Sequence, residues 1–127
     1  MQEQHLFEYA VLRVVPRVER EEFINVGVIV FCTSQRFLEV TFEMNATKLR
    51  ALSADLDLDD VAAYLQALKQ ICEGKKEGGT IAALPAASRF RWLTATRSTI
   101  VQASKVHPGL CSDPKQTLDK LFAQLVK

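Results

Sequence analysis

The chain has 127 residues, a formal net charge of +1, 48% hydrophobic residues and 24% charged residues, a composition that excludes a disordered chain. Its length is typical of one domain, so we expect a single domain over residues 1–127. The longest apolar run, Val26 to Cys32, is too short to cross a membrane, and the N-terminus lacks the features of a secretory leader. We therefore expect a cytoplasmic protein with no membrane contact.

The first third of the chain predicts two strands. Residues Phe7 to Val15 are rich in β-branched and aromatic side chains, and Pro16 ends this strand because proline cannot donate to a sheet ladder. Ile24 to Phe31 is a nearly continuous apolar run, which is typical of a central strand covered on both faces. Gly27 inside this run predicts a β-bulge, or a place where another backbone or a ligand comes close.

A third strand is predicted after a turn at residues 33–35. Its apolar side chains alternate with polar ones, so that Glu39 and Thr41 lie on one face of the sheet. We expect that face to contact solvent and helices to cover the other face. The three strands together would form a meander.

Two helices are predicted in the middle of the chain. Asn45 can cap a short helix through Leu52, because its side-chain oxygen can accept from a free backbone N–H. Asp57 can cap a longer helix that ends at Gly74, a residue type common after the last helical position. This second helix has one apolar face, formed by Leu58, Val61, Leu65, Leu68 and Cys72.

The last part of the chain predicts a long connecting loop over residues 75–88 and strand character at residues 89–93 and 99–104. Residues 107–109, His-Pro-Gly, predict a turn, and Asp113 is suited to cap a C-terminal helix. The expected fold is therefore α+β. It has an antiparallel sheet of about four to five strands that starts with the three-stranded meander, packed with two to three helices including the C-terminal one.

The common catalytic and cofactor motifs are missing from the sequence, so we expect no cofactor and no metal. There is no phosphate-binding loop, no dinucleotide fingerprint, no H-E-x-x-H and no G-x-S-x-G. The three cysteines, Cys32, Cys72 and Cys111, lie far apart, which favours reduced thiols. His107 and Cys111 precede a predicted helix whose N-terminus could lower the thiol pKa; the alternative is a turn histidine and a bystander cysteine.

Charge is distributed unevenly along the chain. Residues 1–77 hold 9 basic and 13 acidic side chains, whereas residues 78–112 hold 4 basic and no acidic ones. The second segment should attract anions or an acidic surface, unless the two parts of the chain neutralise each other within one fold.

Two groups of polar residues are candidates for a binding or catalytic site. The first surrounds the connection between the two predicted N-terminal strands and contains Arg13, Arg17, Arg20, Glu22 and Asn25. Arginine forks could hold a phosphate or carboxylate, with Glu22 as a base or as the residue that orients an arginine. The alternative is a solvated turn with weak ion pairs.

The second group lies in the acid-free segment and contains Arg97, Ser98, Gln102 and His107, with Arg89, Arg91 and Trp92 before them. Cations, hydroxyls and an aromatic ring suit phosphate oxygens and stacked bases. A net charge of +1 is nevertheless low for a nucleic-acid binder, so nucleic acid is a weakly supported partner. In the alternative, these arginines pair across the sheet with the acidic residues 19–22.

Two stretches of the chain resemble one family. Residues 9–31, Y-A-V-L-R-V-V-P-R-V-E-R-E-E-F-I-N-V-G-V-I-V-F, look like the opening motif of the family catalogued as domain of unknown function 3037. Residues 90–109, F-R-W-L-T-A-T-R-S-T-I-V-Q-A-S-K-V-H-P-G, followed by D-P and L-x-x-L-F-A-Q-L-V, are similar to its second motif, so the resemblance covers nearly the whole chain. The resemblance implies a small bacterial protein, often encoded near kinases of the HipA type, and assigns no role to the matched polar residues.

These observations favour a non-enzymatic binding or accessory module, in which an arginine-rich surface engages an acidic protein or a phosphorylated ligand. A HipA-like kinase is the partner that the resemblance implies. The alternative is an enzyme acting on a phosphate-bearing or nucleic-acid substrate, with Arg13, Arg17 and Arg97 as an anion clamp and Glu22 or His107 as acid or base. A homodimer formed through an open sheet edge is a further possibility.

Overall fold

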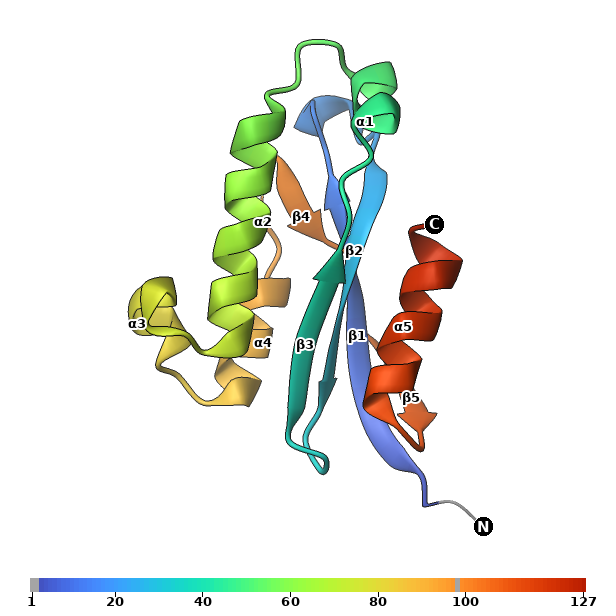
Figure 1. Cartoon of the computed structure of the whole chain (residues 1–127), viewed down its shortest axis with the longest axis vertical. Helices are drawn as coiled ribbons and strands as arrows, with labels where there is room; N and C mark the ends of the chain where they lie inside the picture. Colours follow the sequence, from blue (N-terminus) through green and yellow to red (C-terminus); the bar gives the residue numbers. More distant parts are fainter. Residues whose placement is uncertain (1–2, 98) are drawn as a thin grey trace.

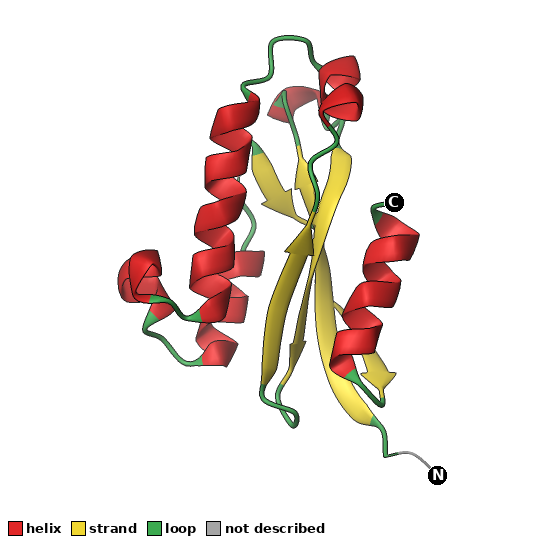
Figure 2. Cartoon of the chain, in the orientation of Figure 1, coloured by secondary structure: helices red, strands yellow, loops and turns green. Residues whose placement is uncertain are grey.

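One antiparallel sheet of five strands organises the computed structural model, which describes residues 3–97 and 99–127 (Figures 1 and 2). The strands are β1 (His5–Val14), β2 (Ile24–Cys32), β3 (Phe37–Phe42), β4 (Val101–Ala103) and β5 (His107–Cys111). The order is β3-β2-β1-β4, and β5 pairs with β1 further along the same edge as β4. The predicted α+β fold and the opening meander are thereby confirmed.

Five helices surround the sheet within the described residues: α1 (Ala46–Leu52), α2 (Leu58–Glu73), α3 (Gly79–Ala82), α4 (Ala86–Thr94) and α5 (Pro114–Leu125). Two single 3-10 turns, Val18–Arg20 and Lys76–Gly78, complete the elements. The three predicted caps are confirmed, since the side chains of Asn45, Asp57 and Asp113 each accept from backbone N–H groups of the first helical turn. None of the described helices has both the length and the apolar character needed to cross a membrane.

Helices cover both faces of the sheet, and α5 lies on the side opposite α2 (Figure 2). Alternate residues of β2 therefore enter two different cores. Val26, Ile29 and Phe31 pack with α2 and α4, whereas Val28, Val30 and Cys32 pack with Leu118 and Phe122 of α5. The prediction that the face of Glu39 and Thr41 has no helix over it was wrong, because α5 contacts β2 and β3 on that side.

The predicted strand at residues 89–93 was also wrong, because these residues belong to α4. Alternation of charged and apolar residues favoured a strand, but the helix places Phe90 and Leu93 on one buried face. The Phe90 ring lies 5.2 Å from that of Phe31, centre to centre, so the packing of α4 on the sheet overrides the local pattern. The predicted loop at 75–88 likewise contains a 3-10 turn, α3 and the start of α4.

Gly27 lies next to an irregular feature of the sheet. Leu12 pairs with Gly27 and Arg13 pairs with Asn25, so Val26 is an extra residue and the predicted bulge is confirmed. A Cβ on Gly27 would lie 2.7 Å from the carbonyl oxygen of Thr41, so the backbone of β3 also comes close. The turn predicted at 107–109 was wrong, since these residues pair with β1 as part of β5.

Candidate functional site

Three of the candidate residues form one row across the sheet. Arg13 of β1 lies opposite Asn25 of β2 on one side and opposite Gln102 of β4 on the other. Directly opposite residues of antiparallel strands share a face, so the three side chains start from the same side of the sheet. We call these three residues the polar row.

Arg13 occupies the centre of the polar row and has no acidic partner. Its guanidinium carbon lies 4.0 Å from the centre of the Phe23 ring, a cation-π contact. Its Nε is buried and makes no hydrogen bond to any described residue. Burial lowers the pKa of Arg13, and no carboxylate acts in the opposite direction. The Arg13 side chain is thus positioned by the Phe23 ring, and no carboxylate of the protein neutralises its charge.

The two amides of the polar row are held by backbone carbonyls. Asn25 Nδ2 donates to the carbonyl oxygen of Leu125 at 3.1 Å, near the C-terminal end of α5. Gln102 Nε2 donates to the carbonyl oxygen of Thr99 at 2.9 Å. The Asn25 Oδ1 is buried without a hydrogen bond inside the described part of the chain. These bonds hold the two amides on the strands that flank Arg13.

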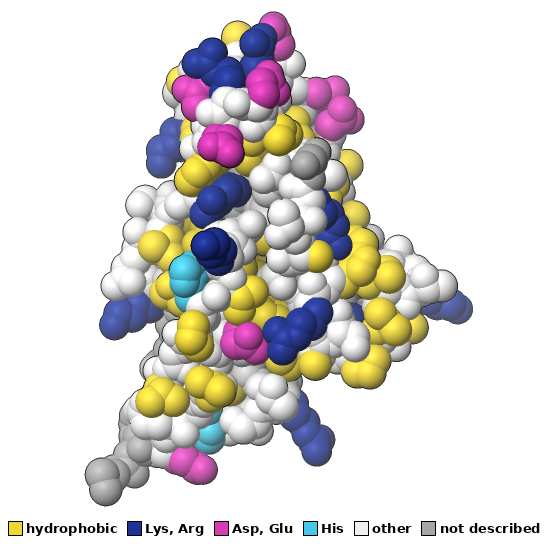
Figure 3. Space-filling model, turned by 180° about the vertical axis from the view of Figure 1, so that it is seen from behind, with side chains coloured by type: hydrophobic (Ala, Val, Ile, Leu, Met, Phe, Trp, Pro, Cys, Tyr) yellow, Lys and Arg dark blue, Asp and Glu magenta, His cyan; other side chains and the backbone are white. Residues whose placement is uncertain are grey.

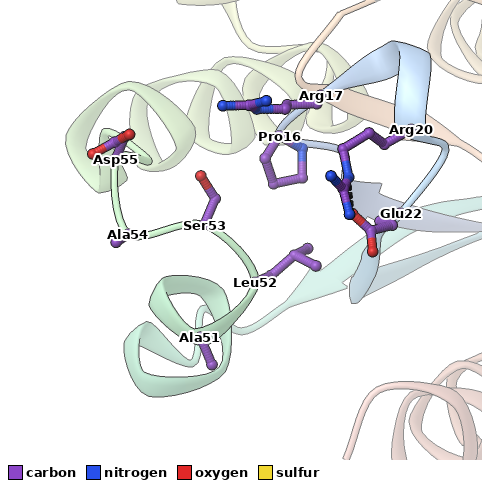
Figure 4. Close-up of a pocket in the computed structure, with 9 residues that line it drawn as sticks. All are labelled: Pro16, Arg17, Arg20, Glu22, Ala51, Leu52, Ser53, Ala54 and Asp55. Atoms are coloured by element: carbon purple, nitrogen blue, oxygen red, sulfur yellow. Dashed lines mark hydrogen bonds and ion pairs between the residues drawn. The ribbon is translucent and has the colours of Figure 1, made fainter.

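Arg17, Arg20 and Glu22 line a separate cavity of about 440 Å³ (Figure 4). It lies where the connection between β1 and β2 meets the connection between α1 and α2, and its other lining residues are Pro16, Ala51, Leu52, Ser53, Ala54 and Asp55. Figure 4 shows Arg17 on one side of the hollow and the Arg20–Glu22 pair on another. The first predicted group is therefore divided between this cavity and the polar row.

The ionisable residues of the cavity balance one another. Arg20 Nε lies 2.6 Å from Glu22 Oε1, and this contact raises the pKa of Arg20 and lowers the pKa of Glu22. A general base at neutral pH needs a carboxylate with a raised pKa, so the shift at Glu22 runs against that role. Arg17 and Asp55 carry the two remaining charges of the lining, which leaves the cavity with no net charge.

The second predicted group does not converge on the first. Arg97 stacks on Trp92, with its guanidinium carbon 4.1 Å from the ring centre, and donates to the Trp92 carbonyl oxygen. His107 stacks on Tyr9, with ring centres 5.3 Å apart. Ser98 lies outside the described residues. Arg17 and Arg97 line two separate cavities, and Arg13 lines neither of them.

The arginines of the acid-free segment also find partners other than residues 19–22. Arg91 lies 3.5 Å from Glu8, and Arg89 donates to the carbonyl oxygen of Leu84 at 2.6 Å. Figure 3 shows mixed acidic and basic side chains at the end of the molecule that carries the β1–β2 connection. The middle of the same view has Lys and Arg side chains beside a histidine and fewer acidic ones.

The cysteines provide neither a metal site nor a reactive thiol. Cys32, Cys72 and Cys111 are free and buried. Burial raises the pKa of Cys111, which is the opposite of the lowering expected from the helix after it. The described residues contain no cluster of three or more His, Cys, Asp or Glu side chains that could hold a metal ion.

Phe23 is the residue of this site that the sequence analysis missed. It lies two positions before Asn25, and strand periodicity puts such residues on the same face. The sequence did offer one indication of its role, because Phe23 is an aromatic residue directly after the charged connection between β1 and β2. Phe23 is 45% exposed, so a ligand that reaches Arg13 could also contact its ring.

The fold and the polar row define a small α+β protein with an unneutralised arginine on a sheet face. The chain belongs to the family described as protein of unknown function (DUF3037), whose model matches residues 9–126. The comparisons with curated proteins and with solved structures found no match. The resemblance noted in both terminal stretches is thereby confirmed.

Proposed function

We propose that this protein is a non-enzymatic binding module that holds an anionic group of a partner at the polar row. The observation that carries this proposal is the Arg13 guanidinium, which is stacked on Phe23 and has no carboxylate partner. Arg20 and Arg91, by contrast, already have acidic neighbours. An anion at Arg13 would gain a charge-assisted hydrogen bond without first breaking an ion pair.

The neighbours of Arg13 support a planar or tetrahedral oxyanion as the ligand. A guanidinium offers several N–H donors in a fixed fork, which matches the geometry of carboxylates and phosphates. Gln102 and Asn25 flank it in the sheet and can contribute further polar contacts. The exposed ring of Phe23 would cover one side of the bound group and exclude water from it.

The partner that fits this chemistry is an acidic or phosphorylated segment of another protein. A HipA-like kinase, which the family resemblance implies, would be such a partner if one of its acidic or phosphorylated loops reached the polar row. Nucleic acid fits less well, because a net charge of +1 gives only a small basic footprint. The neutral cavity at Arg17 is a weaker candidate, because its two acidic residues oppose an anion.

The test is a titration of the isotope-labelled protein with inorganic phosphate and with an acidic phosphoserine peptide, followed by NMR. We expect the Arg13 Nε–H and the side-chain amides of Asn25 and Gln102 to shift. Arg13→Gln should weaken peptide binding roughly tenfold or more, since a hydrogen bond to a charged group contributes about 1.5–3 kcal/mol. Arg17→Gln serves as the matched control and should leave the affinity unchanged.

A second arm addresses the partner. The purified protein is mixed with a HipA-like kinase in phosphorylated and unphosphorylated form, and the affinity of each is measured by calorimetry. Shifts centred on the Arg17 cavity, or equal binding by wild type and Arg13→Gln, would contradict the proposed site. Turnover of nucleotide or nucleic acid abolished by Glu22→Gln would contradict the non-enzymatic reading.

A further inference from the structure

Strand β3 is an open edge of the sheet. Within the described residues it pairs with β2 and with no other strand. The Glu43 N–H donates to the Val26 carbonyl oxygen at 2.8 Å, so the backbone groups of Glu43 point towards β2. In an antiparallel strand these groups point to opposite sides in alternate residues, so every second residue before Glu43 also points towards β2. The register with β2 is regular throughout, so the backbone groups that point away from β2 are those of Leu38, Val40 and Phe42.

These outward N–H and C=O groups have no partner in the described chain. Proteins usually protect such an edge with proline, a bulge or very short strands. The opposite edge shows this protection, because Pro108 interrupts the donors of β5. Strand β3 has six residues, with no proline, no glycine and no bulge. The edge is therefore able to accept another strand.

In Figure 1 β3 runs between α2 on one side and α5 on the other, and neither helix crosses it. Leu38, Val40 and Phe42 are only partly buried although they pack against the core beneath α2. An incoming strand would bury the remaining apolar surface of these side chains as well as the backbone groups.

We propose that a second copy of this chain occupies the edge, pairing β3 with β3 in antiparallel fashion about a two-fold axis at Val40. Val40 has outward backbone groups, so the two Val40 residues would exchange both of their hydrogen bonds. This register puts Leu38 opposite Phe42 of the second copy, and Glu39 opposite Thr41 of the second copy. The two sheets would become one continuous sheet.

The side chains of β3 are complementary to themselves in this register, which a two-fold interface requires. On the α2 side, the opposing pairs Leu38–Phe42 and Val40–Val40 are all apolar. On the α5 side, each Glu39 faces a neutral threonine, so no two like charges are directly opposite. Glu39 also lies 3.7 Å from Lys115 within its own chain, which reduces repulsion between the two copies. A second copy thus fits without any buried unpaired charge.

The dimer can be tested with a matched pair of variants at Thr41. Thr41→Glu would place a carboxylate opposite Glu39 of the second copy at two symmetric positions, whereas Thr41→Lys would place an ammonium there. We expect Thr41→Glu to raise the dimer dissociation constant roughly tenfold and Thr41→Lys to lower it, because cross-strand charge pairs repel or attract. Glu39→Lys combined with Thr41→Glu should restore dimerisation.

The measurement is the molar mass by light scattering over a range of concentrations, with circular dichroism to check that each variant is folded. Wild type should approach twice the mass of one chain, and the exchange of the Val40 amide should slow as concentration rises. A mass of one chain at every concentration would overturn the proposal and would leave the edge to an extended segment of a different protein. Equal changes of the dimer dissociation constant in Thr41→Glu and Thr41→Lys would overturn the proposed register.

Discussion

The Arg13 guanidinium carbon lies 4.0 Å from the centre of the Phe23 ring. Phe23 directly precedes β2 and Arg13 is near the end of β1, so the contact lies where the connection between the two strands begins and ends. The stacking holds the cation on the sheet face without neutralising it. Arg13 is thereby positioned before any ligand binds, which lowers the entropy lost on binding.

A double-mutant cycle on Arg13 and Phe23 measures this contact in the folded protein. Arg13→Gln, Phe23→Leu and the double variant should give a coupling of about 0.5–1 kcal/mol in the free energy of unfolding, as for other partly exposed cation-π pairs. Urea denaturation followed by circular dichroism provides the values. The control cycle pairs Phe23→Leu with Arg17→Gln and should show no coupling. Equal couplings in both cycles would mean that the stacking contributes nothing specific.

Ser104 completes the hydrogen bonding of β1 where β4 ends. Its Oγ accepts from the buried Val11 N–H at 2.8 Å, and its own N–H donates to the Val11 carbonyl oxygen at 2.8 Å. Ser104→Ala would leave the Val11 N–H without a partner and should destabilise the fold by about 1–3 kcal/mol. Ser112→Ala, at an exposed position, is the control and should change stability by less than about 0.5 kcal/mol. Faster amide exchange at Val11 in Ser104→Ala would show that the lost bond is the cause.

Gly27 cannot accept a side chain without movement of β3. A methyl group there would lie 2.7 Å from the Thr41 carbonyl oxygen and 2.8 Å from the Phe42 Cβ. Gly27→Ala should therefore destabilise the fold by about 2–3 kcal/mol or prevent folding, because the clash is with backbone. Gly74→Asn is the comparison, since asparagine tolerates the positive φ of this helix end and should cost less than about 1 kcal/mol. Thermal and urea unfolding of both variants would decide.

Cys72 makes the stability depend on pH in the alkaline range. Burial raises its pKa from 9.0 to about 12. The folded state then holds the thiol proton more tightly than the unfolded state, so this stabilisation is complete below the unfolded pKa and disappears as pH rises from about 9 towards 12. Cys72→Ala should accordingly show a smaller fall in unfolding free energy as the pH rises from about 9 to about 11. Parallel curves for the two proteins would contradict the effect of burial.

Local features were read correctly where short-range physics decides the structure. Asn45, Asp57 and Asp113 cap helices because each side chain reaches backbone N–H groups only two or three residues away. The run from Ile24 to Phe31 became a central strand because both of its faces are apolar. Such choices depend on neighbours in the chain, and those neighbours are visible in the sequence.

The predictions were wrong where contacts between residues distant in the sequence determine the local structure. Residues 89–93 alternate like a strand, but Phe90 finds its place against Phe31 only when the segment is helical. His107 to Gly109 resemble a turn, but the missing side chain of Gly109 lets the Phe7 ring lie against that strand. Neither partner is near in sequence, so no local pattern could indicate the outcome.

The amino-acid sequence by itself determined the α+β class, the three capped helices and the choice of Arg13, Asn25 and Gln102 as polar residues of interest. Only the tertiary structure decided that these three share a row, because one extra residue, Val26, shifts the β2 register. Without that bulge Asn25 would lie opposite Val14, with its side chain on the face that α2 covers. Side chains alternate between the faces of a strand, so a one-residue shift moves a polar group from one face to the other.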